Sequence, residues 1–143
     1  MKKHLLTILF VAVAGVFSVQ AQDVTGKWKT VDDETGEAKS IVEITEKDGK
    51  IYGKVVEILN PEKKNAKCKD CPGEDKDKPI LGLTIIKGLS KSGKEYSGGK
   101  ILDPNKGKLY KCNVSLDGKD KLNVRGYIGI SLLGRTQTWS RVK

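Results

Sequence analysis

The sequence predicts an all-β protein, an eight-stranded antiparallel meander barrel that follows a cleaved signal peptide. Three observations lead to this prediction. The N-terminus carries an apolar run that ends in a small residue, the rest of the chain consists of short segments of β-branched and apolar residues, and turn residues separate these segments at nearly regular intervals. About eight strands at such spacing in 122 residues suggest a meander closed into a barrel, with an open β-sandwich as the alternative.

Residues 1–21 have the three parts of a secretory signal peptide. Residues 1–4 are basic, residues 5–16 are almost continuously apolar, and Ala21 provides the small residue at the cleavage position. The apolar run is too short to span a membrane comfortably. We therefore expect an exported protein, periplasmic or secreted, whose mature chain 22–143 is a single β-barrel domain without a transmembrane segment. An uncleaved N-terminal anchor is the alternative.

Cleavage removes His4, the only histidine of the chain. Ser-His-Asp and Cys-His catalysis need an imidazole, and zinc hydrolases normally bind their metal through histidine. Carboxylates, lysines and tyrosines remain for acid–base chemistry, but none of them stands in a diagnostic spacing. We therefore predict no catalytic residue, no metal site and no cofactor, and we favour a non-enzymatic function.

The predicted strands are short and are joined by turns. Asp48-Gly49 and Asp117-Gly118 are typical of hairpin turns in which glycine adopts a positive φ. Gly98-Gly99 inside a strand indicates a bulge, a sharp bend or a close backbone approach, and Asp103-Pro104 starts a turn with a preset φ. The strands are expected at residues 26–31, 38–46, 50–59, 83–88, 94–102, 108–116, 121–128 and 134–142.

Alternation of side chains assigns faces in the last two strands. In strand 121–128, the apolar face is expected to contain Leu122, Val124 and Ile128. In the last strand, one face is expected to contain Arg135, Gln137, Trp139 and Arg141.

A guanidinium beside an indole can stack on the ring or bind an anion. Stacking would close one end of a barrel, because Trp28 on the first strand must neighbour the last strand. An eight-stranded barrel is either filled by side chains or holds one small ligand. We place the candidate ligand site, for a small hydrophobic or anionic molecule, at the barrel mouth, with residues Trp28, Tyr127, Arg135, Gln137 and Trp139. Structural roles are expected for Arg125, Arg141, Gly98, Gly99 and Asp103.

Residues 60–79 interrupt the strand pattern and form a long loop with six lysines and five acidic residues. We interpret the loop as a solvated excursion. It contains Cys68 and Cys71, and an oxidising compartment favours a disulfide between them, with Cys112 as a buried thiol. Thiol–disulfide activity is the weaker alternative, because Pro72-Gly73 follows the second cysteine where a helix would be needed to activate the first.

Positive charge is concentrated in the second half of the chain. Residues 89–143 contain 12 lysines and arginines against 4 acidic residues, whereas residues 22–88 contain 13 against 14. A basic half could bind an anionic envelope component such as lipid headgroups, but solvation of strand faces explains most of these lysines. Export argues against nucleic acid. A packed structural or interaction protein with a basic docking face therefore stands beside ligand binding as a second hypothesis.

Several motifs together resemble a known family. Gly26-Lys27-Trp28 with a late-strand arginine resembles the calycin superfamily, which includes the lipocalins. More specific motifs are Pro79-Ile80-Leu81-Gly82, Gly98-Gly99-Lys100-Ile101-Leu102-Asp103-Pro104, Gly107 with Tyr110, Val124-Arg125-Gly126-Tyr127 and Gly134-Arg135-Thr136-Gln137-Thr138-Trp139. Over residues 24–143 they look like the exported bacterial family of domain of unknown function 2147, although Tyr96 replaces a frequent tryptophan. The resemblance implies a calycin-like barrel and an envelope location, and it implies no activity.

Overall fold

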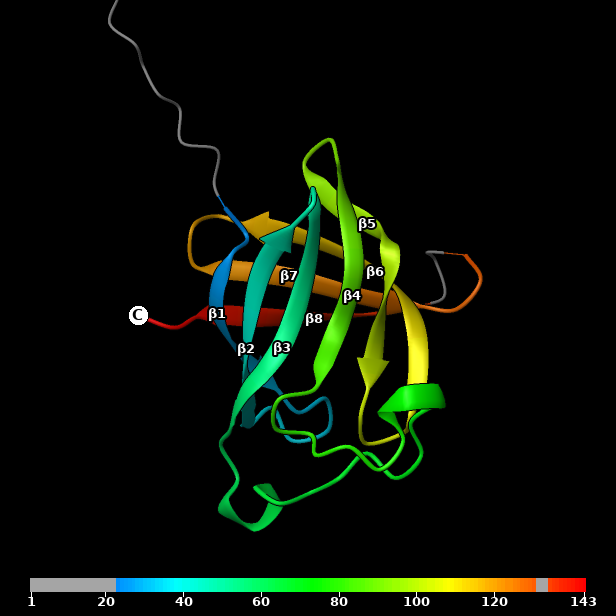
Figure 1. Ribbon diagram of the computed structural model, residues 1–143. Coiled ribbons are helices and arrows are strands. Elements are labelled where there is room, and N and C mark those ends of the chain that lie inside the picture. The colour runs from blue at the N-terminus through cyan, green and yellow to red at the C-terminus, as the bar shows by residue number, and fades with distance from the viewer. Residues whose placement is uncertain (1–22, 131–133) are drawn as a thin grey trace, which may run out of the picture.

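The computed structural model describes residues 23–130 and 134–143, and the predicted signal peptide at 1–21 lies outside them. Each strand pairs with the next, and the last pairs with the first, so that the sheet closes into a barrel (Figure 1). This arrangement confirms the predicted all-β meander barrel and shows that the open sandwich is wrong. The strands are β1 (Gly26–Val31), β2 (Ala38–Lys47), β3 (Lys50–Ile58), β4 (Thr84–Ser92), β5 (Glu95–Asp103), β6 (Lys108–Asp117), β7 (Lys121–Tyr127) and β8 (Gly134–Arg141).

Strand β4 is the one strand that extends well beyond its predicted end at residue 88. Gly88 suggested a stop, but the strand continues to Ser92 through a register shift against β3, in which Ile51 pairs with Leu89 and Tyr52 with Lys87. Gly88 is thus the extra residue of a bulge, which bends the strand without ending it.

The two ends of the barrel differ in their connections. At one end, which we call the closed end, the β2–β3, β4–β5 and β6–β7 turns are short. At the other, which we call the open end, lie the β1–β2, β3–β4, β5–β6 and β7–β8 loops. In Figure 1 the β2–β3 and β4–β5 hairpins point upward, and the long β3–β4 loop lies at the bottom.

Large apolar side chains fill the closed end. Trp28 is completely buried there, and its Nε1 donates a hydrogen bond to the carbonyl of Val24 at 2.9 Å. Burial of each such side chain stabilises the fold by roughly 1.5–3 kcal/mol. The other fully buried side chains of this region are Val42, Ile44, Ile51, Ile86, Leu89, Val114 and Leu122.

Arg141 covers this core from outside. Its guanidinium lies 4.3 Å from the centre of the Trp28 ring, and it donates hydrogen bonds to the backbone carbonyls of Asp23, Thr25 and Lys119 at 2.8–3.0 Å. The N-terminal segment, β1 and the β6–β7 turn are thereby joined by one side chain. Stacking of arginine on tryptophan, one of the two interpretations of the sequence, is therefore found at Arg141 and Trp28.

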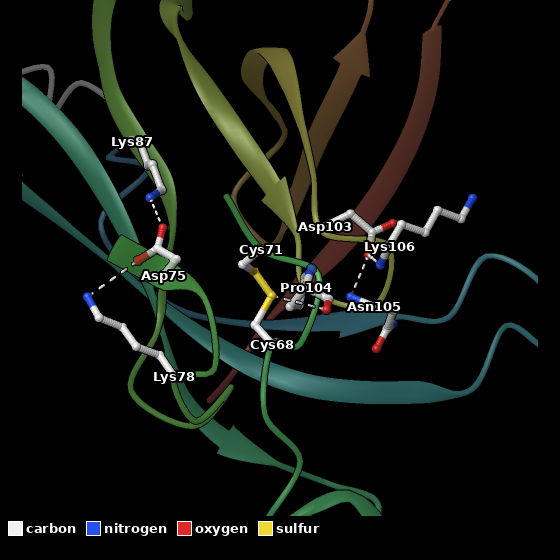
Figure 2. The surroundings of a disulfide bond; sticks show 9 residues. All are labelled: Cys68, Cys71, Asp75, Lys78, Lys87, Asp103, Pro104, Asn105 and Lys106. Carbon is white, nitrogen blue, oxygen red and sulfur yellow. Dashed lines mark hydrogen bonds and ion pairs between the residues drawn. A yellow bond between two sulfur atoms is a disulfide. The ribbon is translucent and has the colours of Figure 1, made fainter. Parts of the chain in front are cut away.

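Most of the β3–β4 loop is exposed, as expected of a solvated segment, but the loop folds against the open end through its two cysteines. It contains the short 3₁₀ helices η1 (Pro61–Lys63) and η2 (Gly73–Asp75). Its Cys68–Cys71 disulfide is buried in the core, with the Cys68 sulfur 3.3 Å from the Pro104 carbonyl oxygen of the β5–β6 loop (Figure 2). The sequence pattern missed this packing because the two cysteines are the only deeply buried residues in a strongly charged segment.

A close backbone contact and two ion pairs of Asp75 fix the loop further. A Cβ on Gly107 would lie 2.0 Å from the Asp70 carbonyl oxygen, so only glycine allows the β5–β6 loop to approach so closely. The carboxylate of Asp75 lies between Lys78 and Lys87 and forms ion pairs with both (Figure 2). The Lys87 hydrogen bond is the main reason that the pKa of Asp75 is lowered.

Candidate functional site

A cavity of about 1250 Å³ includes the open half of the barrel and the mouth between its loops. Its inner wall is mainly apolar, because strands β3, β4, β5, β7 and β8 direct apolar side chains inward there, whereas polar and charged side chains line its mouth. Cavities of this order accommodate small organic ligands, whose apolar parts bury most of their surface. The apolar lining residues include Val55, Ile58, Ile80, Ile85, Ile101, Leu102, Val124 and Trp139.

A chain of polar groups runs from the cavity wall to the rim. The Trp139 indole Nε1 donates to Gln137 Oε1 at 2.9 Å, and Gln137 Nε2 donates to Asp33 Oδ1 at 2.5 Å. The guanidinium of Arg135 lies 3.9 Å from the other oxygen of Asp33. The backbones of β1 and β8 pair only at Trp28–Arg141 and Lys29–Ser140. Beyond this pairing, the side chains of Arg135 and Gln137 connect β8 to Asp33 of the β1–β2 loop.

A pair of hydroxyl groups lies in the same lining on the β1–β2 side. Thr30 and Ser40 are both buried, and their side-chain oxygens are 2.7 Å apart. Each hydroxyl keeps unused hydrogen-bonding capacity, so the pair adds a buried polar point to the cavity wall.

The rim carries charges of both signs. The β1–β2 loop contributes four carboxylates, and the pKa of Asp32 is lowered because its carboxylate accepts hydrogen bonds from the backbone N–H groups of Glu34 and Thr35. Opposing cations are Lys39, Lys63, Lys106 and Arg135. The rim thus has cationic positions for an acidic ligand group without being uniformly basic.

Four of the five predicted ligand residues lie together along the cavity. Tyr127, Arg135, Gln137 and Trp139 all line it, because β7 and β8 pair in register from Leu122–Trp139 to Tyr127–Gly134. Trp28 does not lie with them. It lies at the closed end beneath Arg141. The first residue of β1 that lines the cavity is Thr30, two positions after Trp28.

The residues expected to be structural lie outside the cavity or at its edge. Arg125 on β7 donates to the Thr136 hydroxyl at 3.0 Å on the outer face. Gly98 has a φ of +83° in a register shift of β5, and a Cβ on Gly99 would meet the Lys87 carbonyl oxygen at 2.3 Å. Asp103 Oδ1 accepts hydrogen bonds from the backbone N–H groups of Asn105 and Lys106 and shapes the β5–β6 turn.

All three cysteines are buried. Cys68 and Cys71 are 0% and 3% exposed, so an attacking thiolate cannot reach either sulfur without local opening. Cys112 is a free thiol in the core, and burial raises its pKa to about 12. A protonated, enclosed thiol is a poor nucleophile.

Sequence reasoning missed several site residues. No sequence motif marks Asp33 or the Thr30–Ser40 pair. Asp33 contacts Gln137, and Thr30 contacts Ser40, only because the fold brings segments distant in sequence together.

Within residues 23–130 and 134–143, no group of three or more histidine, cysteine or acidic side chains is arranged to hold a metal ion. In the same part of the chain, no helix has the length and hydrophobicity needed to cross a membrane.

Comparison with known proteins agrees with this architecture. The sequence profile of a family described as an uncharacterized protein conserved in bacteria, domain of unknown function 2147, matches residues 26–141. No curated protein matches the chain. Among solved structures, the chain is similar to a protein from the human pathogen Helicobacter pylori that is described as belonging to the lipocalin family. The TM-score is 0.76 and the sequence identity is 24%, and the match covers 86% of this chain and 85% of the other. The chain belongs to the family of domain of unknown function 2147, and its fold is lipocalin-like.

Proposed function

We propose that the protein binds a small hydrophobic or amphipathic molecule, without chemical conversion, in the cavity at its open end. The observation that supports this most directly is the contrast inside one barrel, because side chains fill the closed half and leave about 1250 Å³ at the other. The inner part of the cavity, where isoleucine, leucine and valine side chains line it, is favourable for apolar ligand groups. The lipocalin-like fold also supports this proposal.

At the rim, Arg135 offers a position for an acidic or hydrogen-bonding ligand head. The side chain of Arg135 is 77% exposed, and its contact with Asp33 is long at 3.9 Å. Such an exposed ion pair contributes little to stability, so a ligand carboxylate can replace it at small cost. We place the apolar body of the ligand against Ile85, Ile101 and Trp139, and the head near Arg135 and Gln137.

The two tryptophans allow a direct test, because one lies in the cavity and the other does not. In Trp28→Phe, Trp139 is the single tryptophan, and its fluorescence is expected to change on titration with fatty acids of 8 to 18 carbons. In the matched control, Trp139→Phe, the remaining Trp28 is expected to stay constant. If no chain length changes the Trp139 signal, or if Trp28 responds equally, the proposal is wrong.

The head-group assignment needs a separate comparison. Arg135→Gln is expected to weaken binding of decanoic acid about fivefold to tenfold, since a charge-assisted hydrogen bond is lost, and to leave decanol binding nearly unchanged. Val124→Trp, which fills the cavity, should abolish binding of both. Equal loss of acid and alcohol in Arg135→Gln would contradict an anionic head at this position.

We also infer that the protein is exported, periplasmic or secreted. The Cys68–Cys71 disulfide supports this inference, because structural disulfides persist mainly in oxidising compartments. The protein recovered from the cell envelope or the medium is expected to begin at Gln22. An N-terminus that retains residues 1–21 would instead indicate an uncleaved anchor.

A further inference from the structure

A row of lysines crosses three neighbouring strands on the outer face of the barrel. Lys87 on β4 lies opposite Lys100 on β5, and Lys100 lies opposite Lys111 on β6. Like charges directly opposite each other on one face of a sheet destabilise it. The row therefore costs stability wherever no anion compensates its charges.

The protein compensates only one end of the row. Lys87 forms an ion pair with Asp75 of the β3–β4 loop (Figure 2). Lys100 and Lys111 are exposed, and neither takes part in an ion pair within the described part of the chain. Two adjacent cations are thus left for an anion from outside.

The uncompensated end of the row meets exposed apolar side chains. Lys111 lies opposite Tyr127 at the end of β7, and its Nζ donates a hydrogen bond to the Gly129 carbonyl at 3.4 Å. On either side of Gly129, Ile128 and Ile130 are 61% and 60% exposed. Beyond the end of β7, the described chain extends away from the barrel on the right of Figure 1. We call Lys100, Lys111, Ile128 and Ile130 the Lys–Ile surface.

We propose that the Lys–Ile surface docks the protein on an anionic lipid bilayer. Lysines next to a bilayer attract acidic headgroups, and apolar side chains beside them insert at the boundary between headgroups and acyl chains. A bilayer satisfies both parts of the surface at once, whereas a free acidic glycan would use only the lysines and leave both isoleucines in water. Ile128 also lines the cavity, so docking brings the cavity mouth next to the bilayer.

The test measures binding of residues 22–143 to vesicles, because the apolar segment within 1–21 would bind lipid by itself. We expect binding to phosphatidylcholine vesicles with 30% phosphatidylglycerol to be at least tenfold tighter than to pure phosphatidylcholine, and to weaken as salt is raised. Ile128→Ser with Ile130→Ser, and Lys100→Glu with Lys111→Glu, should each weaken binding to the anionic vesicles at least tenfold.

Matched controls separate this surface from general charge and hydrophobicity. Lys47→Glu with Lys50→Glu makes the same charge change at the β2–β3 hairpin, where these residues are paired and exposed at the closed end. Leu81→Ser removes a 47% exposed leucine elsewhere. Both controls should bind within about twofold of the wild type, and all variants should keep the wild-type circular dichroism and melting temperature.

Three results would overturn the proposal. They are absence of binding to the anionic vesicles, equal binding to neutral vesicles, and equal losses in the control variants. A dimer in analytical ultracentrifugation that Ile128→Ser with Ile130→Ser dissociates would assign the surface to a second copy of the chain instead. Because Lys100 and Lys111 lie on the outer face, Lys100→Glu with Lys111→Glu should retain fatty acid binding in the cavity, so this proposal and that of ligand binding can fail separately.

Discussion

The closed and open ends of the barrel are stabilised by different interactions. At the closed end, tightly packed apolar side chains surround Trp28, and Arg141 covers them. At the open end the cavity removes part of the core, and a disulfide, an Asp75 ion pair and the Asp33–Gln137 hydrogen bond connect the loops and strands around it. The difference indicates how a small barrel can keep a cavity: close packing stabilises one end, and cross-links hold the loops at the other.

The largest effect is expected at the closed end. Trp28→Ala removes a fully buried indole and its hydrogen bond to Val24, and should lower the free energy of unfolding by about 3–5 kcal/mol. Urea denaturation of the purified protein measures this change. A loss below about 1 kcal/mol would mean that the closed end is not the principal source of stability.

The disulfide is expected to matter less. Cys68→Ser with Cys71→Ser should lower the free energy of unfolding by about 2 kcal/mol, the chain-entropy value for so short a loop. Because the pair packs on the β5–β6 loop, the variant should also show faster proteolysis within residues 60–79, detected by mass spectrometry. Unchanged protease resistance would indicate that noncovalent contacts alone hold the loop.

One substitution made at both ends compares them directly. Val42→Ala at the closed end should lower the free energy of unfolding by roughly 2 kcal/mol, through lost burial and a new void. Val124→Ala should lower it by less than about 1 kcal/mol, because Val124 already borders the cavity. Equal losses of unfolding free energy for the two variants, measured by thermal or urea denaturation, would contradict the difference in packing between the two ends.

The smallest effect concerns pH at the open end. The pKa of Asp75 is lowered chiefly by Lys87, so ionised Asp75 stabilises the folded state at neutral pH, and this contribution disappears as the pH falls through its folded-state pKa. Asp75→Asn should therefore cost no more than about 1 kcal/mol at pH 7 and nothing at a pH low enough to protonate Asp75 in the folded protein. Urea denaturation at both pH values is the measurement, and a difference that persists at low pH would exclude this ion pair as its source.

Local patterns in the sequence are sufficient to predict the strands and the barrel. Asp48-Gly49 and Asp117-Gly118 form hairpin turns in which both glycines have positive φ, and the Cys68–Cys71 disulfide also follows from neighbours in sequence. Each of these features depends on a few adjacent residues, and for that reason the amino-acid sequence alone predicts them.

Features that depend on register and on height along the barrel could not be predicted. Alternation shows which face Trp28 occupies but not that it lies beyond the cavity that Trp139 lines, although the two strands are neighbours. Ile128 was expected on the apolar face of a strand, yet β7 ends at Tyr127 and leaves Ile128 exposed. The lysine row exists only because three strands pair with Lys87, Lys100 and Lys111 in line.

The sparse pairing of β1 with β8 has a consequence for folding kinetics. Every other strand pair joins neighbours along the chain, whereas the hydrogen bonds of Arg141 to Thr25 and Asp23 close loops of 116 and 118 residues. Long loops lose the most chain entropy on closure, and contacts of this kind form slowly. We therefore expect the hairpins to form first as an open, curved sheet. The sheet closes into a barrel only when Arg141 contacts the N-terminal segment. Substitutions of Arg141 should accordingly speed unfolding and leave the refolding rate almost unchanged in stopped-flow experiments, and an equally slowed refolding rate would contradict late closure.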